Sequence, residues 1–182
     1  MSFEESNIID VNQESRMLML FGEINESSSF GVTQGLLELQ AMDPMKDISF
    51  IINSHGGHID DCLAIIDVMN CIKPDIRTIV IGKAMSAGAF IAINGTKGKR
   101  YITENSRLML HSLSTSVSGS FNDIQVDIEE VTRLNDKLID IISTNAKLSK
   151  KDVKDLIKRD RYILPQEAIE FGLLDGIVKS IQ

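Results

Sequence analysis

The chain has 182 residues, of which 43% are apolar, and a formal net charge of −7 at pH 7. This size suits a single domain over residues 1–182. The acidic balance gives no broad cationic field for a phosphate backbone, so we expect no nucleic-acid binding. Apolar stretches are too short for a membrane-spanning helix, and residues 1–15 do not resemble a signal peptide, which predicts a cytoplasmic protein without a membrane partner.

Short β-type runs alternate with segments of helical period along the chain. Strands are expected at 16–22, 48–53, 76–82 and 106–112, helices at 28–42 and 59–72, and loose segments at 1–15 and 112–120. This rhythm predicts an α/β fold with a parallel sheet covered by helices. Cys62 and Cys71 lie within the second helical segment and form no CxxC pair, so we expect both to be buried rather than to form a disulfide or a zinc site.

The segment 123–146 keeps an apolar stripe at helical spacing, with charged residues on its other faces. At 1.5 Å per residue it forms a helix of roughly 35 Å, longer than the core of such a small domain can cover. Either it wraps its own sheet or its far end packs on another subunit, and its length favours the second arrangement.

The stretch "GKAMSAGAF", residues 82–90, places Ser86 directly after an apolar strand and before a possible helix. Small neighbours leave the turn uncrowded, so the hydroxyl and the next backbone N–H groups can share one spot at the carboxyl end of the strand. The pattern resembles a nucleophile elbow, although Ala84 stands where G-x-S-x-G has its first glycine. Ser86 as the cap of the following helix is the competing interpretation.

A nucleophilic serine needs a base, and the chain has three histidines. His111 ends the strand at 106–112 and can reach the same sheet edge as Ser86, but a strand-end imidazole bound to backbone fits equally well. His55 and His58 flank Gly56 and Gly57, whose backbone can approach a ligand closely, as an oxyanion hole requires.

His55 and His58, with Asp60 and Asp61, also raise the alternative of metal ligands. Their spacing matches no common zinc signature, which favours exposed loop histidines instead. For the acid that would orient the base, spacing alone does not choose among the downstream aspartates Asp123, Asp136, Asp140, Asp152, Asp155, Asp160 and Asp175.

Four blocks, "KDISFIINSHGGHI", "MNCIKPDIRTIVIGKAMSAGAF", "GTKGKRYITENSRLMLH" and "RDRYILPQEAIEFGLLDGIV", resemble the ClpP family of serine peptidases, the proteolytic subunit of the Clp protease, over about residues 14–180. The resemblance implies a ClpP/crotonase-like repeated β-β-α superhelix with a long protruding handle helix at 123–146. It also implies Ser86 as nucleophile, His111 as base and Asp160 as orienting acid, with the backbone N–H groups of Gly57 and Ala87 as the oxyanion hole. No metal and no organic cofactor is implied, because ATP belongs to a partner unfoldase.

The resemblance further implies a homo-oligomer of two stacked heptameric rings that encloses the sites and admits unfolded polypeptides. The handle helix would join the rings, with Asp123 and Arg159 at the contact, and an AAA+ unfoldase would be the partner. Residues 1–15 form a segment shorter than the family's axial loop plus first helix, so we expect ATPase docking to differ. Lys158 also stands where an acidic residue is common beside the ring-contact arginine.

The leading functional hypothesis is therefore a serine endopeptidase of the ATP-dependent Clp type, either gated by an ATPase or independent of one. A second is a catalytically silent scaffold or regulatory subunit that assembles with an active paralogue. A third is a crotonase-type acyl-CoA enzyme, which would use a glycine oxyanion hole without a Ser-His-Asp set.

Overall fold

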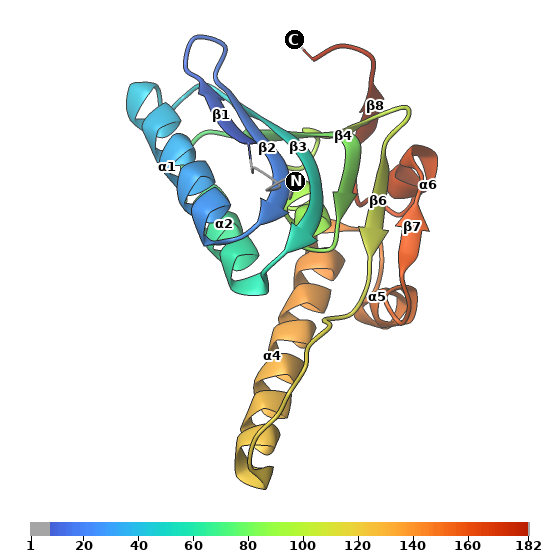
Figure 1. The fold of residues 1–182 in the computed structure, drawn as a ribbon. Helices are drawn as coiled ribbons and strands as arrows, with labels where there is room; N and C mark the ends of the chain where they lie inside the picture. Colours follow the sequence, from blue (N-terminus) through green and yellow to red (C-terminus); the bar gives the residue numbers. More distant parts are fainter. Residues whose placement is uncertain (1–7, 182) are drawn as a thin grey trace, which may run out of the picture.

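The computed structural model describes residues 8–181 as a mixed α/β fold (Figure 1). Within these residues the chain forms eight strands and six helices. In chain order they are β1 (Ile8–Asn12), β2 (Met17–Ile24), α1 (Glu26–Met42), β3 (Ile48–Gly57), α2 (Ile59–Cys71), β4 (Ile76–Met85), α3 (Ala87–Ile93), β5 (Arg100–Thr103), β6 (Arg107–Leu110), α4 (Phe121–Asn145), α5 (Lys150–Leu156), β7 (Arg161–Ile163), α6 (Pro165–Glu170) and β8 (Gly176–Val178). The predicted α/β class is confirmed.

Two predictions from the sequence are wrong at the level of local structure. The segment 1–15 is not loose throughout, because residues 8–12 form β1, an edge strand paired antiparallel with β2; residues 1–7 lie outside the described part. Cys71 at the end of α2 is exposed, whereas Cys62 is buried as expected. Residues 112–120 form neither helix nor strand, as predicted.

The sheet follows the order β1-β2-β3-β4-β5-β8, and β6 and β7 branch from it. Strands β2 to β5 and β8 run parallel to their neighbours, as the alternating pattern predicts. Strand β4 is shared: Thr78–Val80 pair with β5, and Lys83–Met85 pair with β6. The branch therefore begins within the strand that leads to Ser86.

Helices α1, α2 and α3 pack on one face of the sheet and enclose the core (Figure 1). Strand β2 shows how alternation builds this core, because Leu18 and Leu20 are fully buried while Met17 and Met19 are only partly covered. Phe50 of β3 and Phe90 of α3 supply the largest buried side chains. Among residues 8–181, no helix combines the length and the apolar character needed to cross a bilayer.

Helix α4 begins two residues before the predicted segment and projects beyond the sheet (Figure 1). Ser120 and Asp123 form a capping box at its first turn. Its buried residues, Leu138, Ile139 and Ile142, all lie toward its C-terminal end. The N-terminal half therefore does not wrap its own sheet, which removes that alternative for this half of the helix.

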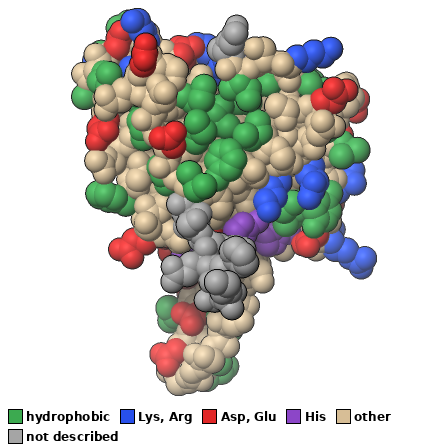
Figure 2. All heavy atoms as spheres, turned by 45° about the horizontal axis from the view of Figure 1, so that its top comes forward, with side chains coloured by type: hydrophobic (Ala, Val, Ile, Leu, Met, Phe, Trp, Pro, Cys, Tyr) green, Lys and Arg blue, Asp and Glu red, His purple; other side chains and the backbone are tan. Residues whose placement is uncertain are grey.

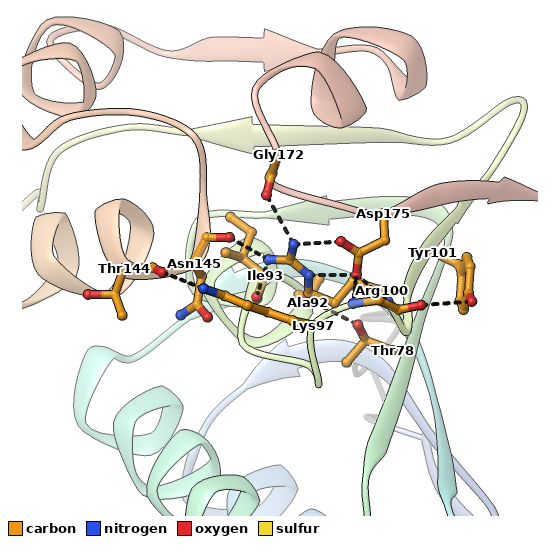
Figure 3. A network of polar contacts seen from close by, with 11 residues as sticks. Thr78, Ala92, Ile93, Lys97, Arg100, Tyr101, Thr144, Asn145, Gly172 and Asp175 are labelled. Atoms are coloured by element: carbon orange, nitrogen blue, oxygen red, sulfur yellow. Dashed lines mark hydrogen bonds and ion pairs between the residues drawn. The ribbon is translucent and has the colours of Figure 1, made fainter.

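Arg100 anchors the C-terminal end of α4 to the sheet (Figure 3). Its side chain is only 4% exposed and forms two hydrogen bonds with Asp175, from Nε at 2.9 Å and from Nη2 at 2.7 Å. The same guanidinium donates to the carbonyl oxygens of Ile93, Asn145 and Gly172. Since the last carbonyls of a helix lack partners within it, this cation satisfies and fixes the base of α4.

Candidate active site

The ends of two neighbouring parallel strands bring Ser86 and His111 together. Strands β4 and β6 pair in parallel up to Met85 and Met109, and the N–H of Ser86 donates to the carbonyl oxygen of Met109 at 2.8 Å. Residues that follow parallel neighbours emerge at one edge of the sheet. Both side chains are partly buried there, and His111 Nε2 lies 2.8 Å from Ser86 Oγ.

This contact favours the nucleophile over the helix cap as the interpretation of Ser86. The residue does occupy the cap position of α3, but its side chain makes no capping hydrogen bond. The hydroxyl instead meets the imidazole, which is the arrangement of a nucleophile and a general base. His111 is likewise not merely bound to backbone.

The backbone of Ser86 is strained in the way that a nucleophile elbow requires. Its φ is 50° and its ψ is −122°, and within residues 8–181 the only other non-glycine residue with positive φ is Arg16. Such a conformation costs on the order of 1–3 kcal/mol and persists only where the surrounding structure enforces it. Here the sharp turn from β4 into α3 directs the hydroxyl away from the helix that follows.

The glycine pair lies directly against this turn. A Cβ placed on Gly56, whose φ is +102°, would come within 2.8 Å of Ser86 Cβ and 3.2 Å of the Ala87 nitrogen. A Cβ on Gly57 would come within 2.0 Å of the Ile24 carbonyl oxygen, so side chains are excluded at both positions. Ala87 is the first residue of α3, where an N–H has no partner within the helix. The backbone N–H groups of Gly57 and Ala87 thus border the same space beside Ser86.

A cavity of about 420 Å³ opens at this place. Its lining combines apolar side chains, both site residues and the two backbone donors: Gly57, His58, Ile59, Asp60, Ser86, Ala87, Phe90, His111, Ser112, Leu113, Ser114 and Leu138. One wall is the segment after β6, which Asn135 of α4 holds by accepting from the Leu113 N–H at 3.3 Å. Figure 2 shows histidine side chains where α4 leaves the body of the molecule.

Asp160 directly precedes β7, the strand that pairs with β6. Strands β6 and β7 run antiparallel with Leu110 opposite Arg161, and their pairing ends there, because the next backbone bond, from the Ser112 N–H to the Ile157 carbonyl oxygen at 2.9 Å, departs from this register. The side chain of Asp160 is exposed and forms no hydrogen bond or ion pair with any residue of 8–181.

Six of the other downstream aspartates bind serine or cationic side chains elsewhere. Two cap helices through neighbouring serines, and four bind cations: Asp123 with Ser120, Asp152 with Ser149, Asp136 with Lys154, Asp140 with Lys150, Asp155 with Lys158 and Asp175 with Arg100. The hydrogen bonds from Ser120 also hold the pKa of Asp123 below its usual value. Asp160, the acid that the family resemblance implies, is not among these six and forms no such contact.

The metal alternative gains no support from the geometry. His55 and His58 are exposed, and His58 Nδ1 lies 3.4 Å from Asp61 Oδ2. Within residues 8–181, no group of three or more His, Cys, Asp or Glu side chains is placed to hold a metal ion.

One contact at the site went unnoticed in the sequence. Cys62 Sγ donates to the carbonyl oxygen of Ala87 at 3.3 Å and so supports the first turn of α3 from α2. Burial, with a smaller contribution from the charge of Asp61, raises the pKa of the Cys62 thiol far above its usual value. This thiol is therefore a neutral donor to the backbone rather than a nucleophile.

The comparison with protein families agrees with the fold. A family model described as Clp protease matches residues 3–181, nearly the whole chain. The match includes β4, α3, β6 and β7, the elements that position Ser86, His111 and Asp160. The chain therefore belongs to the Clp protease family.

Proposed function

We propose that this chain is a serine endopeptidase of the ClpP type, with Ser86 as nucleophile, His111 as general base and Asp160 as the acid that orients the base. The observation that carries the proposal is the 2.8 Å contact between His111 Nε2 and a hydroxyl held on a strained turn. Membership in the Clp protease family supports the same reaction class.

In the proposed reaction, Ser86 Oγ attacks the peptide carbonyl carbon while His111 Nε2 takes the hydroxyl proton. The N–H groups of Gly57 and Ala87 stabilise the oxyanion that forms. His111 then gives its proton to the leaving amine, and water hydrolyses the acyl-enzyme with the same base. These steps need only side chains and backbone of this chain, so the proposal includes no metal and no organic cofactor.

Asp160 would complete the site by accepting a hydrogen bond from His111 Nδ1. Its place directly before β7, which pairs with the strand that precedes His111, supports this role, and its carboxylate forms no hydrogen bond or ion pair within residues 8–181. Geometry of this kind commonly tightens when substrate or a partner binds.

A catalytically silent subunit is the second candidate function. The observation that favours it is the same free carboxylate, because an imidazole without its orienting acid is a poor base. The two candidates differ in whether the chain reacts by itself or only contributes surface to an assembly with an active paralogue.

For assembly, we propose two stacked heptameric rings of this chain that enclose the sites and admit unfolded polypeptide. Helix α4 supports this proposal, since its projecting half carries apolar side chains without cover: Phe121 is 79% exposed, Val126 64% and Ile128 52%. Arg159, in the exposed turn before Asp160, and Asp123, at the tip of α4, are the proposed contact residues. An AAA+ unfoldase would supply ATP-driven unfolding.

The test is labelling with a fluorophosphonate probe, combined with cleavage of an unfolded polypeptide. We expect the wild-type chain to be labelled at Ser86, and Ser86→Ala and His111→Ala to abolish both labelling and cleavage. Ser116→Ala, in the exposed segment outside the cavity, is the matched control and should behave as wild type.

A chain that assembles but is neither labelled nor active favours the silent subunit. If it also binds CoA, the acyl-CoA enzyme replaces both candidates.

A further inference from the structure

The cavity beside Ser86 has apolar walls and one carboxylate. Ile59, Phe90, Leu113 and Leu138 provide the apolar part of its lining. Asp60, in the first turn of α2, is the one Asp, Glu, Lys or Arg that lines it. An apolar wall that ends at a carboxylate matches a side chain with a long aliphatic stem and a cationic head.

Asp60 forms no hydrogen bond or ion pair within residues 8–181. Its neighbour Asp61 faces His58 instead. Arg133 on α4 feels the charge of Asp60, but its guanidinium binds both carboxylate oxygens of Glu130, at 2.7 and 2.5 Å. The carboxylate of Asp60 is thus without a directly bound cation.

Other cations of the molecule stand outside this space. Lysine and arginine side chains lie near the histidines in the view of Figure 2, but none of them lines the cavity. Lys83 and its β6 partner Arg107, the cations on the two strands that lead to Ser86 and His111 at their paired ends, are not among the residues that line the cavity.

We infer that this cavity selects polypeptide segments with a lysine or arginine side chain next to the bond that is cut. The aliphatic stem would lie on Phe90 and Leu138, and the cationic head would meet Asp60. A glutamate at the same place would meet a like charge and bind less well. This inference rests on the proposed function, since it assigns a substrate preference to the same site.

The test compares fluorogenic peptides that differ at one position, with lysine, norleucine or glutamate beside the scissile bond. Norleucine keeps the four-carbon stem of lysine and lacks its charge. For an exposed ion pair we expect kcat/KM for the lysine peptide to exceed that for the norleucine peptide by about 2- to 5-fold. High salt should reduce this ratio, because screening weakens exposed pairs.

Variants of α2 assign the preference to Asp60. Asp60→Asn should bring the ratio of lysine to norleucine to about 1, and Asp60→Lys should make glutamate the better of the two charged peptides. Asp67→Asn is the matched control: it removes the same charge from the same helix about two turns away, at an exposed position that does not line the cavity. Its ratio should equal that of the wild type.

A binding measurement separates this inference from the proposed reaction. Ser86→Ala should bind a labelled lysine peptide more tightly than the norleucine peptide by the same factor, and should lose this difference when combined with Asp60→Asn. If the wild type and Asp60→Asn both cleave the lysine and norleucine peptides with equal kcat/KM, the proposed preference is overturned and the proposed peptidase activity stands. If the fluorophosphonate probe does not label the wild type, but Ser86→Ala still binds the lysine peptide more tightly, the peptidase activity is overturned and the binding preference stands.

Discussion

At the scale of single residues, the site depends on how closely the chain at Gly56 approaches Ser86. Gly56 and Ser86 both have backbone angles that L-residues rarely adopt; Gly56 lies on β3, and Ser86 lies in the turn between β4 and α3. The strain at Ser86 is therefore maintained by contact with another part of the fold rather than by its own sequence neighbours. The small residues at Gly56 and in the turn at Ser86 are therefore needed together, because they allow the two backbones to approach closely.

Replacement of this glycine tests the contact. We expect Gly56→Ala to displace Ser86 and to lower kcat/KM by about 100-fold, because shifts near 1 Å at a reacting group have effects of this size. Gly98→Ala is the matched control: Gly98 also has positive φ, at +86°, but an added Cβ there meets nothing within 4 Å. A fully active Gly56→Ala that retains fluorophosphonate labelling would show that the close approach is not needed.

The role of Asp160 is also decided at this scale. If its carboxylate orients His111 during the reaction, Asp160→Asn should lower kcat by about 10³- to 10⁴-fold, because the amide favours the wrong imidazole tautomer. Asp155→Asn, which changes a carboxylate that binds Lys158 nearby, should alter kcat less than 2-fold, as expected for a surface pair. Equal kcat values for the two variants would exclude Asp160 from the reaction.

At the scale of elements, the Arg100 and Asp175 pair joins the base of α4 to the sheet and to the turn that follows α6. Helix α4 in turn supplies Leu138 and Asn135 to the cavity and its wall. The position of the helix that projects from the molecule is thus linked to the shape of the site through one buried cation.

Removal of this cation should be far more costly than removal of an exposed one. We expect Arg100→Gln to lower the free energy of unfolding by about 3–5 kcal/mol, because it leaves a partly buried carboxylate and three carbonyls without their donor. Lys99→Gln, one residue earlier, breaks exposed pairs with Asp47 and Asp75 and should cost less than about 1 kcal/mol. Urea denaturation measures both, and similar losses would contradict the role of Arg100.

The same pair predicts a pH dependence of stability. Burial opposes the ionisation of Asp175, but hydrogen bonds from Arg100 and from the N–H of Gly98 outweigh it and lower the pKa of Asp175. An acid with a lowered pKa stabilises the fold above its unfolded value of about 3.9 and loses this contribution as the pH falls through the folded value. The difference in unfolding free energy between wild type and Asp175→Asn should therefore be largest near pH 7 and shrink toward pH 3; a constant difference would contradict it.

At the scale of the whole molecule, the projecting half of α4 is one of the parts whose apolar side chains a single chain leaves uncovered. We expect Val126→Glu to weaken the pairing of rings, since it places a charge among exposed apolar side chains, and to shift the particle from the mass of two rings toward that of one. Gln125→Glu, an adjacent exposed polar position, is the control. Light scattering measures the masses, and an unchanged mass for Val126→Glu would remove this half of α4 from the contact.

Local pattern predicted β2, β3, β4, β6, α1, α2 and α4, where the apolar spacing is strong. It did not identify the short elements β5, β7, β8, α5 and α6. It missed β1 because an edge strand among polar residues forms only by pairing with β2, which local propensity does not report. It also could not choose Asp160, since spacing along the chain does not report which carboxylate the fold brings near His111. The family resemblance supplied the residue, and its role stays a prediction.

The shared use of β4 has a consequence for how the site could be switched off. Ser86 follows β4, which pairs with both β5 and β6, and His111 follows β6. The last backbone hydrogen bond between these two strand ends runs from the Ser86 N–H to the Met109 carbonyl oxygen. This bond lies next to the contact between the two reacting side chains, so opening of the strand ends would break both. Amide hydrogen exchange at Ser86 therefore reports how often this end of the β4–β6 pair opens.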